Sequence, residues 1–223
     1  MSLKKSLRKK IRKHNFNKSL ENLPKKKLKN GGKRLFIDCG SNVGQGYEYF
    51  RTYFTPESYD VVMIEPNPNC MQIIKEKFSA QKNVEFIEAA AWIDYNPLYF
   101  YGLVEDERGK TTDGGSVITD HNSIMYEVDK RSGIQVSAIS LSDLIIEKAK
   151  TYHQIVIKMD IESAEYEVLA DILKTDAKKY ISYMYIEFHS QYFKESEREQ
   201  YLHKEKHLIK NLRRNKVGVS LWH

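Results

Sequence analysis

A run of glycine and small polar residues follows a short apolar segment, and these residue types suit ligand binding through the backbone. The run contains Asp38, Gly40, Asn42, Gly44 and Gly46. Glycines adopt positive φ angles and let a ligand approach the main chain closely, and free N–H groups at the start of a following helix attract a carboxylate. The spacing differs from the G-x-G-x-x-G of dinucleotide folds. We therefore expect a ligand with an amino-acid end and no diphosphate, its ammonium held by Asp38 directly or through water. The alternative is a plain tight turn between a strand and a helix.

An acid ends the next apolar segment, and small residues end the one after it. The two oxygens of Glu65 can accept hydrogen bonds from both hydroxyls of an adenosine ribose. Two alanines further along leave room for a flat adenine, with Trp92 nearby, although a tryptophan is more often ordinary core. Beyond the glycine run, the expected cofactor-binding residues are Glu65, Pro66, Asn67, Ala90, Ala91 and Trp92.

Later ionisable residues are suited to acid–base chemistry. Alternation directs Lys158, Asp160 and Glu162 to one side near the end of a strand. A carboxylate or an imidazole there can accept or relay a proton. Asp160 and Glu162 could also hold a divalent cation through oxygen, but the sequence shows no wider ligand cluster and we assign no metal. The expected catalytic residues are Asp160, Glu162, Glu187 and His189, with Asp160 also near the cofactor.

Two residues stand where a helix is expected to begin after this motif. Ser163 is a plausible N-cap because its hydroxyl can accept from a free N–H group. Glu165 is favoured there by the helix dipole. For Glu165 a capping role and a role in the site both stay open.

These residues need elements that place them at one edge of a sheet. Apolar segments alternate with helical ones, which predicts βαβ units and an α/β, Rossmann-like fold with a mostly parallel sheet and helices on both faces. Residues 93–140 break this alternation and are expected to form an inserted hairpin region with turns at Gly109 and Gly114-Gly115. Strands are predicted at 34–38, 59–65, 84–92, 155–161, 180–189 and 216–222, and helices at 46–54, 68–80, 164–173 and 195–214.

Composition is typical of a globular domain. The chain has 223 residues, 41% hydrophobic and 30% charged, with a net charge of +6. No apolar run reaches the length of a membrane span and no secretory signal is evident, so we expect a cytoplasmic location. The two cysteines, Cys39 and Cys70, form no disulfide or metal-ligand pattern.

The positive charge is concentrated at the N-terminus. Residues 1–34 contain 14 Lys and Arg against one acid, Glu21. We divide the chain into a basic arm, 1–32, helical or flexible, and a folded domain, 33–223. Leu3, Leu7 and Ile11 recur at helical spacing, which favours a short amphipathic helix over 3–14. The arm is expected to be dispensable for folding and to contact a polyanion such as nucleic acid, an anionic membrane or a glycan; a solvated tail is the alternative.

Together these motifs resemble the FkbM-type methyltransferases over about residues 34–190. The matching stretches are 36–44, 64–68, 89–92 and 157–169, with looser likeness at 114–116 and 139–144. The resemblance implies a class I methyltransferase fold and methyl transfer from S-adenosylmethionine, usually to a hydroxyl of a sugar, glycan or small natural product. The family usually has glycine where this chain has Ser163, and a side chain there is expected to narrow the substrate space.

Other functions stay open on the sequence alone. RNA ribose methylation is one, because Lys158 and Asp160 are similar to residues of lysine-assisted enzymes of that class. A module that binds the cofactor without catalysis is another. The motifs of DNA amino-methylating and Pro-Cys enzymes are absent, and the glycine spacing disfavours an NAD-dependent oxidoreductase.

Overall fold

The computed structural model describes residues 3–28, 31–103, 114–121 and 133–222, without the side chains of residues 3–9 and 11. The helical face expected from Leu3, Leu7 and Ile11 and the turn expected at Gly109 therefore lie outside the described residues. Within the described residues, no helix is both long enough and apolar enough to cross a membrane.

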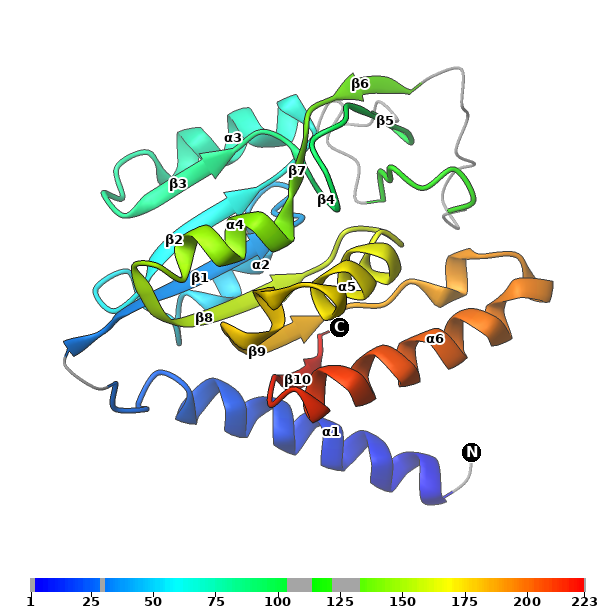
Figure 1. Ribbon diagram of the computed structural model, residues 1–223, viewed down its shortest axis with the longest axis horizontal. Helices are drawn as coiled ribbons and strands as arrows, with labels where there is room; N and C mark the ends of the chain where they lie inside the picture. Colours follow the sequence, from blue (N-terminus) through cyan, green and yellow to red (C-terminus); the bar gives the residue numbers. More distant parts are fainter. Residues whose placement is uncertain (1–2, 29–30, 104–113, 122–132, 223) are drawn as a thin grey trace.

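A six-stranded sheet in the order β10-β9-β8-β1-β2-β3 forms the centre of the molecule (Figure 1). Every pairing in it is parallel. From β1 the chain adds β2 and β3 on one side and then returns to add β8 on the other. The carboxyl ends of β1 and β8 thus flank a switch point, where open parallel sheets bind ligands. The strands are β1 (Lys33–Cys39), β2 (Asp60–Ile64), β3 (Val84–Ile87), β8 (Tyr152–Met159), β9 (Ile181–Ile186) and β10 (Gly218–Leu221).

Helices cover both faces of this sheet because its strands carry near-continuous apolar runs, whose side chains point alternately to the two faces. Leu35 and Ile37 of β1 face one buried cluster, which contains residues of α4, α5 and α6. Phe36 faces the other cluster, with residues of α1, α2 and α3. The expected α/β fold is confirmed. The helices are α1 (Leu3–Asn22), α2 (Gln45–Phe50), α3 (Pro68–Phe78), α4 (Leu141–Lys148), α5 (Glu165–Lys174) and α6 (Glu195–Arg214).

The inserted region departs from one prediction. The single strand expected over 84–92 is wrong, because β3 ends at Ile87 and the amide of Ala89 bonds back to the carbonyl of Ile87 at 3.1 Å. The next segment, β4, pairs with a strand that also lies outside the central sheet. The inserted strands are β4 (Ala90–Trp92), paired with β7 (Ala138–Ser140), and β5 (Leu98–Phe100), antiparallel to β6 (Ile134–Val136).

The N-terminal helix packs on the domain. It extends well beyond the expected 3–14, and Leu20 near its end is 1% exposed within the core. The ring of Phe16 lies 5.4 Å from that of Tyr185, and the Ser19 hydroxyl is 3.0 Å from the Tyr185 hydroxyl. The C-terminal half of this helix therefore contributes side chains to the core, which argues against the expectation that the arm is dispensable for folding.

Candidate functional site

The glycine run forms a tight loop between β1 and α2. The amides of Gly40 and Ser41 both donate to the carbonyl of Ile64, at 3.0 and 3.1 Å, and this fixes the loop against the end of β2. Gly40 has a φ of 74°, and a side chain there would collide with the backbone carbonyl of Asp160. Gly44, which has a φ of 88° and directly precedes α2, packs against Phe78 at the end of α3. Gly40 thus lets the loop meet β8, whereas Gly44 serves packing outside the pocket.

A buried lysine supports this loop from below. Lys158 Nζ donates to the carbonyl of Gly40 at 2.6 Å and lies 3.2 Å from Asp38 and 3.4 Å from Asp160. Burial lowers the pKa of Lys158, but the two carboxylates outweigh it and raise the pKa above its usual value. Asp38 is 0% exposed and does not line the pocket. Asp38 is instead paired with Lys158, so this structure does not place it for the direct contact with a ligand ammonium that was one of the two expected arrangements.

Glu65 is positioned by two backbone amides. Its Oε1 accepts from the amide of Asn67 at 2.9 Å, and its Oε2 accepts from the amide of Asn42 at 2.8 Å. Burial raises the pKa of Glu65 to about 7, although these hydrogen bonds oppose the shift. Each oxygen keeps a lone pair for a further donor. Asn67 itself caps α3 by accepting from the amide of Asn69, and it does not line the pocket.

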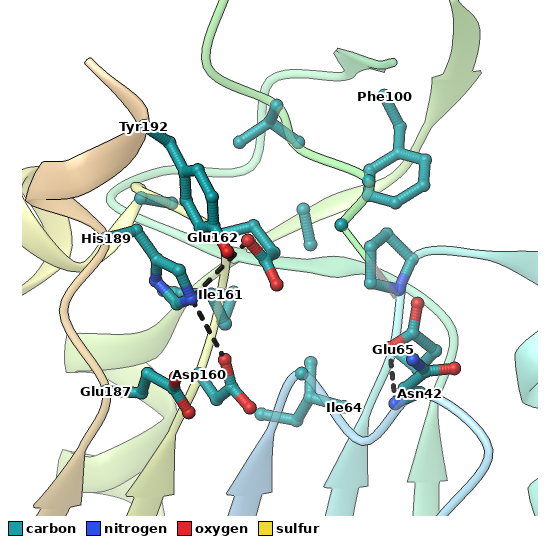
Figure 2. Close-up of a pocket in the computed structure, with 18 of the residues that line it drawn as sticks. Asn42, Ile64, Glu65, Phe100, Asp160, Ile161, Glu162, Glu187, His189 and Tyr192 are labelled. Atoms are coloured by element: carbon teal, nitrogen blue, oxygen red, sulfur yellow. Dashed lines mark hydrogen bonds and ion pairs between the residues drawn. The ribbon is translucent and has the colours of Figure 1, made fainter. Parts of the chain in front are cut away.

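These elements surround a cavity of about 340 Å³ at the carboxyl edge of the sheet (Figure 2). Asn42 and Glu65 lie at one side of it and Asp160, Glu187 and His189 at the other. This volume is at the lower end of the range of small-molecule sites, roughly 300–1,000 Å³. The predicted residues that line it are Gly40, Asn42, Glu65, Pro66, Ala90, Ala91, Asp160, Glu162, Glu187 and His189.

Trp92 was predicted to contact the cofactor, but it does not line the cavity. The cavity is also lined by residues that were not predicted as site residues. Phe100 closes the cavity from β5, and its ring lies against Gly115, where any side chain would collide with it. The Gly114-Gly115 pair was the only signal of this contact in the sequence. Tyr192 lies beside His189, the two rings stacked at 5.6 Å. The other unpredicted lining residues are Gln45, Ile64, Val117, Ile161 and Ala164.

His189 is held among three carboxylates. Its Nδ1 lies 2.9 Å from Glu165 Oε1, and its Nε2 lies 3.4 Å from Glu162 and 3.5 Å from Asp160. Burial lowers the pKa of His189, but the carboxylates outweigh it and raise the pKa to about 10. Glu165 also accepts from the amide of Ile161 at 2.9 Å. Glu165 therefore ties the β8–α5 loop to His189 from outside the pocket.

The same loop contains two strained residues. Glu162 and Ser163 have φ angles of 50° and 78°, in the left-handed region that favours glycine, which explains why glycine suits position 163. Ser163 is not the N-cap of α5, which is Ala164. Its hydroxyl lies 2.8 Å from Nδ1 of His121, so it faces away from the pocket and does not narrow it. His121 belongs to no motif, and no pattern in the sequence predicts its place beside Ser163.

Two further carboxyl groups in this region have raised pKa values. Burial raises the pKa of Glu162 to about 8, with His189 opposing the shift. Burial, assisted by the nearby Asp160, raises the pKa of Glu187 to about 7. Groups that exchange protons near neutral pH suit general acid–base chemistry.

Fold and site together define an α/β protein with a cavity at the switch point of a parallel sheet, where such folds bind ligands, and with a cluster of ionisable side chains on one side of that cavity. The sequence matches the Methyltransferase FkbM domain over residues 38–215. The chain therefore belongs to the FkbM methyltransferase domain family.

Solved structures give only distant likenesses. The methyltransferase FkbM from Methylobacillus flagellatus KT is 14% identical with a TM-score of 0.45, over 81% of this chain and 37% of that one. Yeast methylglyoxal/isovaleraldehyde reductase Gre2, complexed with NADPH, is 9% identical with a TM-score of 0.44, over 84% and 53%. A putative S-adenosylmethionine-dependent methyltransferase from Listeria monocytogenes is 10% identical with a TM-score of 0.28, over 70% and 49%. The alignments thus span about half or less of each of these proteins. No curated protein matches the chain.

Proposed function

We propose that this protein transfers a methyl group from S-adenosylmethionine to a hydroxyl oxygen of a sugar, a glycan or a small natural product. The observation that carries the proposal is that one cavity joins two different ends. The Gly40 loop and Glu65 form one end, and an acid–base cluster around Asp160 forms the other. Membership of the FkbM methyltransferase domain family supports the reaction class.

The shape and chemistry of the first end fit this cofactor. Gly40 and Asn42 line the cavity, and Gly40 has no side chain, so an amino-acid moiety can approach the main chain there, while Glu65 presents two buried oxygens for the ribose hydroxyls. Ala90 and Ala91 line the cavity with small side chains beside these groups, which leaves space for adenine. When bound there, S-adenosylmethionine supplies an electrophilic methyl group.

The second end supports a hydroxyl acceptor. A hydroxyl nucleophile must lose its proton to a base within hydrogen-bond reach. Asp160 and Glu187 line the cavity as carboxylates, and Glu187, with a pKa of about 7, exchanges protons near neutral pH. Holding the acceptor in line with the methyl group can itself supply up to roughly 7–11 kcal/mol. In this proposal Glu187 takes the proton while Asp160 orients the hydroxyl.

The lysine-assisted RNA ribose mechanism is less well supported. It requires Lys158 to reach the acceptor. Lys158 is 2% exposed, does not line the cavity and donates to the Gly40 carbonyl. Its role is therefore to hold the cofactor loop.

Cofactor binding is tested by calorimetry with S-adenosylhomocysteine. Glu65→Ala should weaken binding tenfold or more, because hydrogen bonds to a charged acceptor contribute roughly 1.5–3 kcal/mol. Glu85→Ala, at an exposed carboxylate on β3, is the matched control and should bind as the wild type does. Equal affinity of the two folded variants would remove Glu65 from the site.

The reaction is tested by S-adenosylhomocysteine release over sugars, glycans, nucleosides and RNA. Turnover with a hydroxylated sugar or natural product supports the proposal. Turnover with RNA alone would replace it with the ribose-methylation alternative. Tight binding of the cofactor without turnover on any acceptor would indicate a binding module.

A further inference from the structure

The β8–α5 loop and the segment after β9 bring three different ligand atoms together. A nitrogen of His189 and carboxylate oxygens of Asp160 and Glu162 all lie within 4.8 Å of one another, and all three residues line the cavity. We propose that Asp160, Glu162 and His189 bind a divalent transition-metal cation. This inference revises the expectation of no metal, because only the folded structure brings a nitrogen of His189 close to the oxygens of the two acids.

The spacing of these atoms fits a shared cation better than direct hydrogen bonds. His189 Nε2 lies 3.4 Å from Glu162 Oε2 and 3.5 Å from Asp160 Oδ1, and dashed lines mark both contacts in Figure 2. Hydrogen bonds from nitrogen to oxygen are usually about 2.7–3.2 Å long. Ligands at about 2.1 Å from a tetrahedral cation lie about 3.4 Å from one another.

A buried carboxylate orients the imidazole as metal sites require. Glu165 Oε1 lies 2.9 Å from Nδ1 of His189, and both side chains are buried. A hydrogen bond from Nδ1 to a carboxylate directs Nε2 toward the two acids, where a metal would replace its proton, and this is the usual outer arrangement around a metal-binding histidine. The bond from the Ile161 amide to the same oxygen fixes Glu165 in turn.

A second histidine supplies an independent observation. His121 is fully buried, and its Nε2, which has no hydrogen bond among the described residues, lies 3.6 Å from Glu162 Oε2. That oxygen is also buried and has no hydrogen bond there. An unpaired buried polar atom is costly, and a cation would supply the partner that Glu162 lacks. The left-handed φ of 50° at Glu162 is a backbone cost of the kind found at functional sites.

The ligand types indicate which cations fit. An imidazole with two carboxylates suits Mn²⁺, Fe²⁺ or Zn²⁺, whereas Mg²⁺ and Ca²⁺ prefer oxygen alone. With three protein ligands, positions stay open for an acceptor oxygen. Binding of the cation does not depend on the proposed function, but its role does. A hydroxyl bound to the cation would become more acidic. Glu187, which lines the same cavity, would take the hydroxyl proton.

Mn²⁺ binding to the full-length, chelator-treated protein tests the proposal. Electron paramagnetic resonance should detect one bound Mn²⁺ per chain, displaced by Zn²⁺. Glu162→Gln and His189→Gln should each weaken binding by at least tenfold, and Glu165→Gln by roughly 10–100-fold as an outer partner. Asp176→Asn, at an exposed carboxylate, is the control and should leave binding unchanged.

The outcomes separate this proposal from the proposed function. Variants that bind S-adenosylhomocysteine normally but lose Mn²⁺ support the site. If a variant fails to fold, nitrogen hyperfine coupling to Mn²⁺ in the wild type tests the histidine ligand directly. Three results would overturn the site: no stoichiometric binding of Mn²⁺, no nitrogen coupling, or folded variants that bind Mn²⁺ as the wild type does. His189 would then serve only to form ion pairs with the surrounding carboxylates. Methyl transfer without metal would leave the proposed function intact, and metal binding without methyl transfer would remove only the function.

Discussion

Replacing Glu65 with glutamine should change how stability depends on pH. Burial raises the pKa of Glu65 in the folded protein from 4.5 to about 7. Between these values the folded state keeps a proton that the unfolded state releases, so stability is full below about pH 4.5 and falls as pH rises through 7. Because 5% of the residue is exposed, solvent screens this effect little.

The expected magnitude follows from the shift. The difference between 4.5 and about 7 corresponds to roughly 3 kcal/mol, of which roughly 2–3 kcal/mol falls between pH 5 and 8. Glutamine is neutral throughout, so Glu65→Gln should remove this part of the slope. It should also lower stability at acid pH, where the wild type has no such loss, because its amide nitrogen cannot accept from the amide of Asn42 or Asn67.

Urea denaturation at several pH values, with chelator and without cofactor, measures this effect. Glu162, Glu187 and His189 also have raised pKa values and steepen the slope in the wild type and the variant alike. The difference between the two curves therefore isolates Glu65. Glu76→Gln, at an exposed carboxylate on α3, should run parallel to the wild type. If the Glu65→Gln curve were also parallel, burial would not perturb this carboxyl group and the reasoning would be refuted.

Three further changes have defined outcomes. Leu20→Ala should lower the free energy of unfolding by roughly 2–5 kcal/mol, the usual cost of a core cavity. Lys18→Ala, at an exposed position on the same helix, should leave it unchanged. Equal denaturation midpoints for the two variants would show that α1 does not pack on the domain in solution. Asp160→Asn should lower kcat by roughly 100-fold with little change in S-adenosylhomocysteine affinity, and wild-type turnover by the folded variant would exclude the catalytic role. Replacing Arg12 and Lys13 with glutamine should weaken binding to a sulfated oligosaccharide, and wild-type binding should fall steeply with added salt; salt-independent binding would contradict a polyanion contact at the arm.

The glycine loop and Glu65 illustrate what local patterns predict well. Glycine is required where φ is positive or the main chain is crowded, so Gly40 marks its own loop wherever the loop lies. A near-continuous apolar run likewise marks β1 and β8 as buried strands, because a parallel sheet hides both of its faces. The carboxyl ends of such strands then bring Glu65 and Asp160 to one edge without further information.

Burial of a charged group, by contrast, depends on which segment covers it. Asp38 follows the same pattern as the ligand-binding residues, yet the Gly40 loop and Lys158 cover it. The N-terminal segment has few apolar residues, but Phe16 and Leu20 pack against apolar side chains of α2, of β9 and of Trp222, which follows β10. Neither environment is encoded in the residues next to it.

The sequence by itself determined the parallel α/β fold, the glycine loop after β1 and the acid at the end of β2, because periodicity and glycine requirements act over a few residues. Only the tertiary structure decided that Glu165 contacts His189 and that His121 contacts Glu162 beside it. These residues come from segments far apart in the chain and meet only when the strands align. Which groups are buried together, and so which pKa values shift and which atoms can share a cation, is a property of that packing.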